Sequence, residues 1–550
     1  MIDPITLPPL LVVVPILLAV VPLVLGVRWD RTGWATTTVT CSGLFLGAVV
    51  LAHAVFVGGE RVVHPLGGFP GPQGIELVAD EFSTLIALLV AGTALGVLAY
   101  TRTGGPRGNT FYSGYLLLTG GLMGLTFTGD VFNMFVFLEI TGLATYALVA
   151  KSDDPEAAVA ALKYLIVGTV GASIYLIGVG LLFMATGTLN MEHLGSTLPE
   201  TAGYDDPLVR AAFAFVFVGL AIKVAQWPLH SWQPDAYQRA PDGVTPLIAA
   251  LVSTVSAYAL GRVLFGVFTV DFLQGTPWVS EVIVLVGASS LVAGSVLAVM
   301  QPEVKRMLAY SSVSQFGLIV AAYGVVTETA LVGAMIHLLG HGLMKVGLFV
   351  GVGVVAIGYG ARRIDGYADL ARGRPVAAAA MAALGLALVG IPPSIGFLGK
   401  WYIAVGAVEA EVWSIAALIF LSTMLTLLYV ARLLETMYFT PTEAASGIAE
   451  PALATDGGTE TDDGAAPEDG APPDDGAAPD DGAETRVPGS DDEDSGPDSS
   501  GRERRSIGTD VSIGMLGLLV FVAVTAVVLG FAGGPLFDLL EPFATEVFDT

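Results

Sequence analysis

The stretch GLAIKVAQWPLHSWQPDA, residues 219–236, is the most informative part of the chain because it places a lysine inside an apolar segment and then interrupts that segment with a proline. A charged lysine at the centre of a bilayer costs roughly 2.5–3.5 kcal/mol, so Lys223 needs a polar cavity or a counter-charge. Pro228 cannot donate a backbone hydrogen bond and disrupts the preceding turn, which frees carbonyl groups near the lysine. The alternative is a lysine whose long side chain reaches the membrane surface.

The composition of the whole chain indicates a membrane protein with many spans. Of its 550 residues, 54% are hydrophobic and 13% are charged, and the mean hydropathy is +0.72. Cys41 is the single cysteine, so we expect no internal disulfide. The six histidines do not have the spacing of a zinc site, so we expect no metal site. No motif for a flavin, a nicotinamide or an iron–sulfur cluster is present, so we expect no cofactor, and nothing indicates a nucleic-acid partner.

Fourteen apolar segments of about the ~20 residues that a bilayer requires predict an all-α integral membrane protein. They cover residues 5–27, 34–57, 78–100, 111–129, 131–150, 161–185, 208–229, 245–268, 279–300, 306–326, 330–358, 377–403, 411–434 and 510–533. Basic residues such as Arg102, Lys151 and Arg239 flank the odd-numbered connections, and few lie in the even-numbered ones. The positive-inside rule therefore predicts a multi-pass protein of the cell membrane with both termini outside.

An acidic segment of different composition, residues 441–505, follows the thirteenth predicted span. It repeats Asp, Glu, Gly, Ala and Pro and carries 19 acidic residues and four arginines, more than half of the net charge of −26. Such a composition cannot bury a core, so we expect a disordered cytoplasmic insert that acts as a solvated linker, with a specific binding tail as the alternative. The acidic excess on the remaining chain is typical of a halophilic protein.

Charged residues inside the predicted spans are few, and Glu139 is the acidic one in the segment 131–150. A buried carboxylate without a partner would take up a proton, whereas a lysine on another helix would keep it charged. We therefore expect Glu139 to pair with Lys223. The alternative is a structural ion pair that never changes its protonation state.

The eleventh predicted span contains His337, His341 and Lys345, each four residues from the next. This spacing places the three side chains on one helical face. Histidine changes its charge in the physiological pH range, so the row suits a proton relay. The alternative is a pair of histidines that bind backbone carbonyls where helices pack.

The twelfth predicted span repeats the lysine and the proline interruption in reverse order, with Pro392 and Pro393 ahead of Lys400. Spans seven and twelve are five apart and cross the membrane in opposite directions, which is typical of an inverted repeat with its site near mid-membrane. The sequence thus predicts three N-terminal spans, two five-helix repeats, the acidic insert and a last span with its tail, over residues 1–110, 111–268, 279–434, 441–505 and 506–550.

Several of these stretches resemble one known family. The segments GDVFNMFVFLEI, AIKVAQWPLHSWQPDAYQRAP, EVKRMLAYSSVSQFG, HLLGHGLMKVGLF and GIPPSIGFLGKW are similar to the proton-conducting antiporter-like subunits that respiratory complex I shares with the Mrp cation/proton antiporters. The segments GDVFNMFVFLE and ATGTLNM most resemble the D subunit of the Mrp-type multisubunit Na+/H+ antiporter. The resemblance covers roughly the third to the thirteenth predicted span.

The resemblance implies a proton-translocating subunit of a multisubunit Na+/H+ antiporter, with other membrane subunits, protons, monovalent cations and the lipid bilayer as its partners. The proton-transfer residues that it implies are Glu139, Lys223, His337, His341, Lys345 and Lys400. Thr254 stands where relatives often carry a lysine, so we expect Ser253, Thr254 and Ser256 to hold a chain of waters instead.

Two alternatives remain open. One is a proton-pumping subunit of a complex I-like NADH/quinone oxidoreductase or a membrane-bound hydrogenase, in which the redox chemistry takes place on other subunits. The other is a scaffold or quinone-contacting subunit whose lysines no longer function, which Thr254 would favour.

Overall fold

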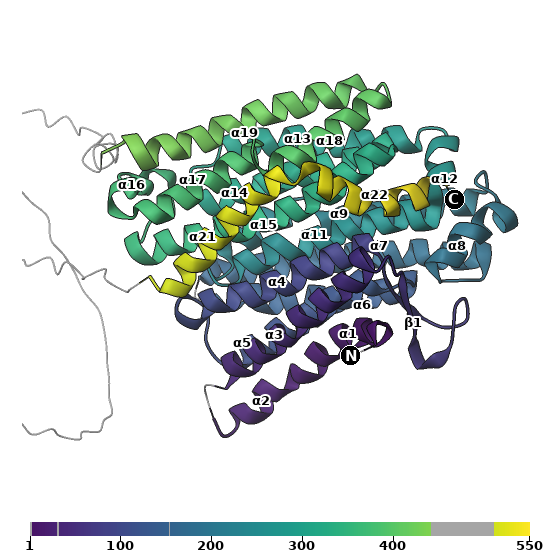
Figure 1. Cartoon of the computed structure of the whole chain (residues 1–550), viewed down its shortest axis with the longest axis horizontal. Helices are drawn as coiled ribbons and strands as arrows, with labels where there is room; N and C mark the ends of the chain where they lie inside the picture. The colour runs from purple at the N-terminus through teal and green to yellow at the C-terminus, as the bar shows by residue number, and fades with distance from the viewer. Residues whose placement is uncertain (1–2, 30–31, 153, 442–510, 550) are drawn as a thin grey trace, which may run out of the picture.

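A computed structural model describes residues 3–29, 32–152, 154–441 and 511–549, and nearly all of these residues are helical. The helices run side by side along the long axis of the molecule (Figure 1). Within the described ranges, twelve helical stretches are long and apolar enough to cross a membrane. The predicted class, an all-α multi-pass membrane protein, is therefore confirmed. The predicted acidic insert lies outside the described residues, apart from Pro441.

The elements fall into three consecutive groups. The first contains α1 (Leu7–Leu18), α2 (Val20–Gly26), α3 (Gly33–Ala52), β1 (Val62–Pro65), β2 (Glu76–Ala79) and α4 (Glu81–Gly104). The second contains α5 (Asn109–Phe127), α6 (Val131–Val149), α7 (Pro155–Thr186), α8 (Met191–Thr197), α9 (Pro207–Val224), α10 (Trp232–Arg239), α11 (Thr245–Val263) and α12 (Thr269–Gly275). The third contains α13 (Val279–Val299), α14 (Val304–Val325), α15 (Glu328–Tyr359), α16 (Leu370–Gly373), α17 (Pro375–Val389), α18 (Ile395–Glu409), α19 (Trp413–Phe439), α21 (Ile513–Val528) and α22 (Gly533–Asp549). The antiparallel strands β1 and β2 pair with Val62 opposite Ala79.

The count of fourteen spans stays a prediction. The fourth predicted span is α5, a helix of 19 residues that is not among the twelve. The twelfth predicted span is divided into α17 and α18, and 15 residues are too few for either helix to cross a bilayer alone.

Aspartate residues begin several of the long helices. The side chains of Asp80, Asp130, Asp154 and Asp206 accept hydrogen bonds from backbone N–H groups in the first turns of α4, α6, α7 and α9. A cap of this kind satisfies one of the free donors at a helix start and stabilises the helix by roughly 0.5–2 kcal/mol. These four aspartates therefore act as N-caps that define where the helices start.

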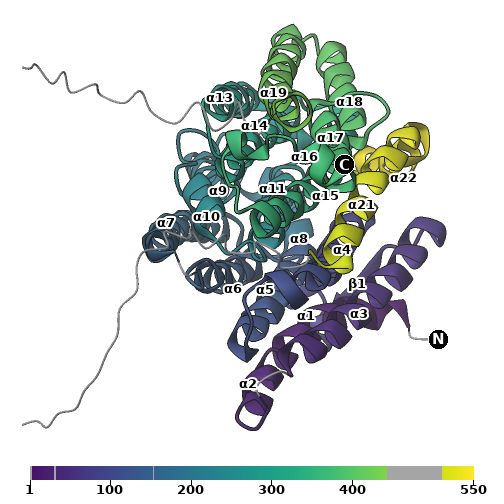
Figure 2. The ribbon, with the colours of Figure 1, turned by 90° about the vertical axis from the view of Figure 1, so that its left-hand side faces the viewer.

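The core of the molecule lies where α11, α14 and α15 pack together in the middle of the bundle (Figure 2). Almost every residue of α11 and α14 is buried, whereas α3, α7, α19 and α21 expose apolar side chains outward. Polar groups on the central helices are thus shielded from the surrounding membrane.

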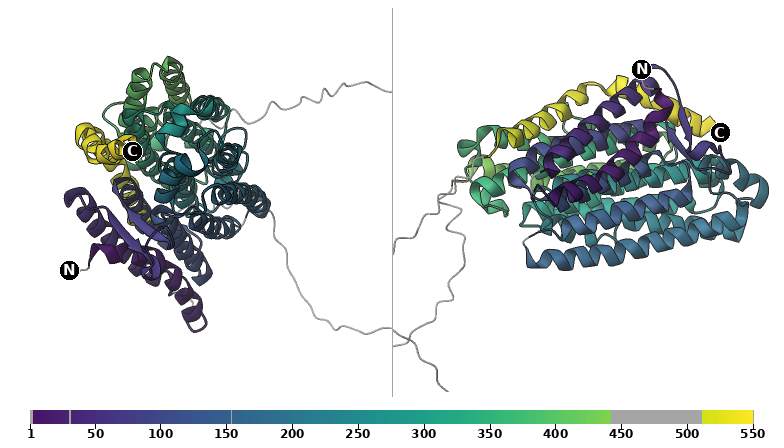
Figure 3. Two further views of the ribbon diagram at one scale, coloured as in Figure 1. Left: turned by 90° about the vertical axis from the view of Figure 1, so that its right-hand side faces the viewer. Right: turned by 90° about the horizontal axis from the view of Figure 1, so that it is seen from below.

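The two ends of the bundle differ in their short elements. Helices α10 and α16 lie at one end, called the α10 end below (Figure 2). The β-hairpin, α8 and α12 lie at the other, called the α8 end (Figures 1 and 3). Residues Pro4–Thr6 contact β1 and α22 contacts α12, so both described termini lie toward the α8 end.

Candidate functional site

The interruption predicted at Pro228 is present between α9 and α10. Ala225 closes α9 with a left-handed backbone, φ 63°, and the helix resumes only at Trp232. The indole Nε1 of Trp232 donates to the carbonyl oxygen of Ile222 at 3.0 Å, so protein and not lipid satisfies this carbonyl group. The break therefore creates a polar position in the interior.

Lys223 occupies the last turn of α9, next to the break, and is 6% exposed. Its Nζ lies 3.4 Å from Oε1 of Glu139 on α6. The carboxylate and the negative end of the α9 dipole both stabilise an ammonium group. A separation of 3.4 Å is at the long limit of a hydrogen bond, so a small movement of either side chain breaks the contact. Glu139 lies at the edge of the protein, with 24% of its side chain exposed.

The polar face of α15 points toward α14. The His337 Nε2 lies 2.9 Å from the side-chain oxygen of Gln315. The Lys345 Nζ donates to the Ser311 hydroxyl at 2.5 Å and to the Leu308 carbonyl oxygen at 2.7 Å. Both side chains are fully buried. Each therefore has a polar partner on a neighbouring helix.

His341 faces α11, where its Nδ1 lies 3.5 Å from the Thr254 hydroxyl. Within the described part of the chain, Nε2 of His341 and Nδ1 of His337 have no hydrogen-bond partner. The described contacts of both rings are thus with side chains, and not with the backbone carbonyls of the alternative interpretation. Free ring nitrogens can accept or donate a further hydrogen bond.

The second interruption separates α17 from α18 and contains Pro392 and Pro393. Gly390 ends α17 with a left-handed backbone, φ 90°. The Lys400 Nζ on α18 reaches back to the carbonyl oxygens of Val389 at 2.9 Å and Leu388 at 3.3 Å. Like Lys223, Lys400 therefore lies at the carbonyl end of a half-helix, where the dipole favours a cation.

A glycine brings α18 against α15 beside this lysine. A Cβ atom at Gly399 would lie 2.6 Å from the Cβ atom and from Nδ1 of His337. Only glycine permits this approach without a shift of the backbone. The packing places Lys400 and the histidine face of α15 in neighbouring positions.

The three positions expected to hold waters differ in their contacts. Ser253 accepts a hydrogen bond from Gln233 of α10 at 2.8 Å, and Thr254 faces His341. Ser256 donates to Val252 within its own helix at 2.8 Å. Ser256 therefore contributes less to a path between helices than its neighbours do.

Four buried polar side chains near the candidate residues were not predicted from the sequence, namely Gln226, Gln233, Ser311 and Gln315. Gln226, in the break, is fully buried, and both polar atoms of its side chain lack a partner among the described residues. All four lie in the segments that resemble the antiporter-like subunits. A polar side chain in an otherwise apolar segment was the sequence signal that could have identified them.

The candidate residues do not form one continuous chain of direct contacts. Glu139 contacts Lys223, and Thr254 links α11 to His341. Among the described residues, no direct hydrogen bond joins Lys223 to Ser253 or Lys345 to Lys400. Mobile waters or side-chain movement must bridge these gaps in any transfer along the row. In the same ranges, no three His, Cys, Asp or Glu side chains are placed to hold a metal ion.

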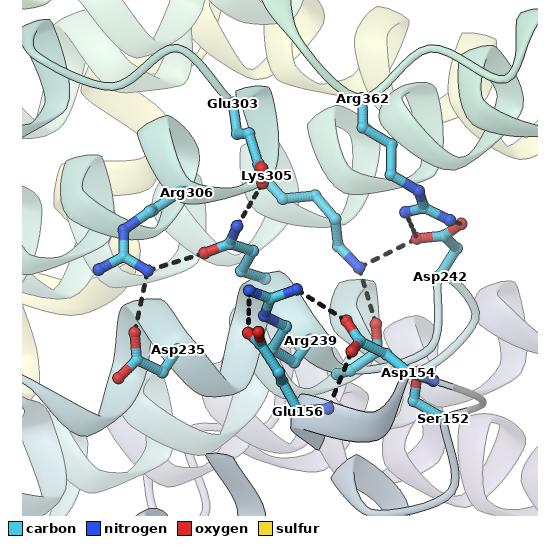
Figure 4. A network of polar contacts seen from close by, with 12 residues as sticks. Ser152, Asp154, Glu156, Asp235, Arg239, Asp242, Glu303, Lys305, Arg306 and Arg362 are labelled. Carbon is cyan, nitrogen blue, oxygen red and sulfur yellow. Dashed lines mark hydrogen bonds and ion pairs between the residues drawn. The ribbon is translucent and has the colours of Figure 1, made fainter. Parts of the chain in front are cut away.

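A network of ion pairs fixes the short helix α10 to its neighbours (Figure 4). Asp235 of α10 contacts Lys163 of α7 at 2.6 Å and Arg306 of α14 at 2.9 Å. Arg239 of α10 contacts Asp154 at 2.9 Å. Asp154 and Arg239 of this network line a cavity of about 700 Å³ at the α10 end. The ion pairs of α10 therefore connect the segment after the first break to both halves of the chain.

Asp242, in the loop after α10, joins the same network. It contacts Lys305 at 3.0 Å and Arg362 at 3.1 Å. Burial opposes its charged form, but the charges of Lys305 and Arg362 prevail and lower the pKa of Asp242 below its usual range. Asp242 is thus a fixed negative charge and a poor proton carrier.

Comparison with known proteins places these residues in one family. The profile of the family described as NADH:quinone oxidoreductase/Mrp antiporter, TM, matches residues 128–426, which include all six candidate proton-transfer residues. The chain is 42% identical to the N subunit of the NADH-quinone oxidoreductase of Desulforudis audaxviator, over 71% of this chain and 78% of that protein. It is 30% identical to the D subunit of the Na(+)/H(+) antiporter of Bacillus subtilis, over 72% of this chain and 80% of that protein. Among solved structures, a chain of the Mrp complex from Dietzia sp. aligns with 25% identity and a TM-score of 0.81, over 100% of this chain and 98% of that one.

Proposed function

The chain belongs to the NADH:quinone oxidoreductase/Mrp antiporter family of transmembrane proteins, and we propose that it is the proton-translocating subunit of a multisubunit Na+/H+ antiporter. One observation carries the proposal: three lysines and two histidines are buried in the helical bundle on polar partners from neighbouring elements. Buried cations destabilise a membrane protein, so a role in transport explains them better than a role in stability.

The first step takes place at Lys223 and Glu139. A proton on Lys223 is stabilised while the two side chains stay in contact at 3.4 Å. Two unit charges about 4 Å apart attract by roughly 4 kcal/mol at an effective dielectric constant of about 20. Moving one charge through about 100 mV corresponds to about 2.3 kcal/mol. The attraction energy that is lost when the pair separates therefore exceeds the energy of moving one charge through about 100 mV, so separation can drive the proton away from Lys223 against the membrane potential.

The proton then crosses from the first half of the chain to the second. Gln226 and Gln233 lie in the segment after Lys223, and Gln233 contacts Ser253 of α11. The neighbouring Thr254 contacts His341. These amides and hydroxyls can orient waters but cannot hold the proton, so His341 is the first residue in this sequence that can accept it.

The last part of the path leads through Lys345 to Lys400. Ser311 and Leu308 hold Lys345, and the end of α17 holds Lys400. A charge on one lysine repels a charge on the next, so the lysines release their protons in sequence. Lys400 delivers the proton to the opposite side of the membrane.

We propose the following membrane arrangement. The α10 end, with its many basic residues, lies in the cytoplasm, and the termini lie outside the cell membrane, which places the acidic insert in the cytoplasm. Residues 111–268 and 279–434 form two inverted repeats. The observation that supports the repeats is that each half contains one interrupted helix with a lysine at the carbonyl end of its first part.

The partners of the chain are other membrane subunits, and homologous chains occur in multisubunit membrane complexes. Glu139 supports a partner on the outward face of α6, because a carboxylate with 24% of its side chain exposed is unfavourable against lipid. The proposal is therefore a transporter subunit that works inside a larger membrane assembly.

The second candidate function is a proton-pumping subunit of a complex I-like NADH/quinone oxidoreductase or a membrane-bound hydrogenase, which the 42% identity to an N subunit favours. Inverted vesicles that carry the complete assembly distinguish the two functions. An antiporter makes the lumen more alkaline when Na+ is added outside the vesicles without a respiratory donor, because protons leave as Na+ enters. Proton movement that requires the donor and ignores Na+ would assign the chain to a redox-driven pump.

A further inference from the structure

A row of polar side chains continues beyond Thr254 toward the α8 end, in a direction that the proposed path does not take. Thr254, Tyr258 and Arg262 are spaced four residues apart on α11, so they lie on one face of that helix. Thr254 and Tyr258 are fully buried, and 14% of the Arg262 side chain is exposed. The row begins at His341, whose Nε2 has no partner within the described residues.

Helix α4 packs beside this face and adds polar groups of its own. Thr84 follows Asp80 by one helical turn, and its hydroxyl is buried without a hydrogen-bond partner in the described part of the chain. Helix α4 also comes close to His341, because a Cβ atom at the adjacent Gly342 would lie 2.6 Å from the Leu89 side chain. The interface of α4 and α11 therefore carries polar groups from both helices near the α8 end, and it reaches the neighbourhood of His341 with the Thr254 hydroxyl on α11 and the apolar Leu89 on α4.

Tyr258 lies in the middle of this interface. Its hydroxyl donates to the Thr126 carbonyl oxygen at 2.7 Å, and its ring packs edge-on against Phe82 with the centroids 4.6 Å apart. The hydroxyl oxygen keeps its capacity to accept a hydrogen bond from water. Tyr258 can therefore orient a water in the row, while its own O–H stays on the Thr126 carbonyl oxygen.

A cavity of about 440 Å³ lies at the outer end of the row, at the α8 end of the molecule. Its lining includes Asp80 and Arg262, together with Arg61, Glu76, Asn190 and Glu192. The walls come from the β-hairpin, α8, the end of α11 and α22, so residues outside the range 128–426 help to form it. The cavity therefore depends on the terminal parts of the chain as well as on the family core.

One ion pair lies where the row meets the cavity. Arg262 Nη1 lies 2.5 Å from Oδ2 of Asp80, whose side chain is 5% exposed. The other oxygen of Asp80 accepts from the backbone N–H and the hydroxyl of Ser83, each at 2.9 Å. Burial disfavours the charged form of Asp80, but Arg262 and Ser83 outweigh it and lower the pKa of Asp80. Both side chains therefore stay charged, and their contact blocks access from the cavity to the row. Neither side chain takes up and releases a proton.

We propose that the Asp80–Arg262 pair is the gate of a second, water-filled branch that joins the cavity at the α8 end to His341. Water enters the branch when the pair separates and hydrates His341. The guanidinium charge of Arg262 remains at the mouth and opposes the entry of all cations, Na+ and hydronium included. The transport role of the branch rests on the proposed function, whereas its water access does not.

Cysteine labelling tests the branch independently of transport. Cys41 is the only cysteine of the chain, so the assembled complex with Cys41→Ser provides a background for the near-isosteric reporters Thr84→Cys and Thr254→Cys. A small anionic methanethiosulfonate is added to right-side-out vesicles, from the side of the α8 end. We expect Asp80→Asn, which keeps a capping side chain for α4, to raise the labelling rate of both reporters at least tenfold.

The matched control is Leu260→Cys, because Leu260 is equally buried on the opposite side of α11. Unchanged slow labelling of both reporters in Asp80→Asn and in the double variant Asp80→Asn/Arg262→Gln would overturn the gate. Equal acceleration of the Leu260→Cys reporter would also overturn it, because it would indicate general loosening of the bundle. If the wild-type complex shows no Na+-driven proton flux while Asp80→Asn still accelerates the labelling of both reporters, only the proposed function is refuted.

Discussion

Glu139→Gln provides a quantitative test of how the Lys223 charge is stabilised. The substitution keeps the size of the side chain but removes the carboxylate that lies 3.4 Å from the Lys223 Nζ. Removing one partner of a fully buried pair costs roughly 3–5 kcal/mol. Because 24% of the Glu139 side chain is exposed, solvent or headgroup screening reduces this to about 2 kcal/mol.

A loss of about 2 kcal/mol lowers the ratio of charged to neutral Lys223 roughly 30-fold, since about 1.4 kcal/mol is a factor of ten. We therefore expect the rate of Na+-driven proton movement in inverted vesicles to fall by more than tenfold, with normal assembly of the complex. The matched control is Glu409→Gln, which removes an exposed carboxylate at the end of α18. A flux within twofold of wild type in Glu139→Gln would refute the electrostatic role of the pair.

Three further predictions concern other parts of the structure. Ser311→Ala removes the hydroxyl that lies 2.5 Å from the Lys345 Nζ and should lower the same flux about tenfold, while Ser312→Ala should leave it unchanged; equal effects would contradict the contact. Gly399→Ala places a Cβ atom 2.6 Å from His337 and should destabilise the complex by roughly 1–3 kcal/mol in thermal unfolding, whereas Gly517→Ala, in open space, should not. Asp242→Asn should destabilise the complex at pH 7. Because the pKa of Asp242 is lowered in the folded state, the stability gained from its charge is complete above about 4, the pKa of an unfolded aspartate, and is lost as the pH falls from there through the lower pKa of the folded state, below which the difference from wild type should disappear.

The helices and their interruptions could be predicted from the sequence because hydropathy and proline act locally. Pro228 and Pro392 mark the two breaks, and the four-residue spacing of His337, His341 and Lys345 fixes their common face. The span count does not follow from the same patterns, since α5 is only moderately apolar and the twelfth span is divided. Local patterns therefore give the elements but not how each crosses the membrane.

The partners of the candidate residues could not be predicted, because they come from distant parts of the chain. Gln315 and Ser311 approach α15 only when α14 packs against it. Asp80 and Arg262 are 182 residues apart and meet only after the first group of helices packs on α11. Ser256 illustrates the converse, since a polar residue expected in the path bonds back to its own helix. Only tertiary packing decides such contacts.

In the proposed function, protons pass along the buried row from Lys223 to Lys400. The most direct test is the Na+-driven pH change in inverted vesicles that carry the complete assembly, compared for wild type, Lys223→Ala and Lys400→Ala at equal protein levels. We predict that each substitution abolishes the pH change, because each removes a proton-carrying group that has no substitute nearby. An unchanged pH change in both variants would contradict the claim.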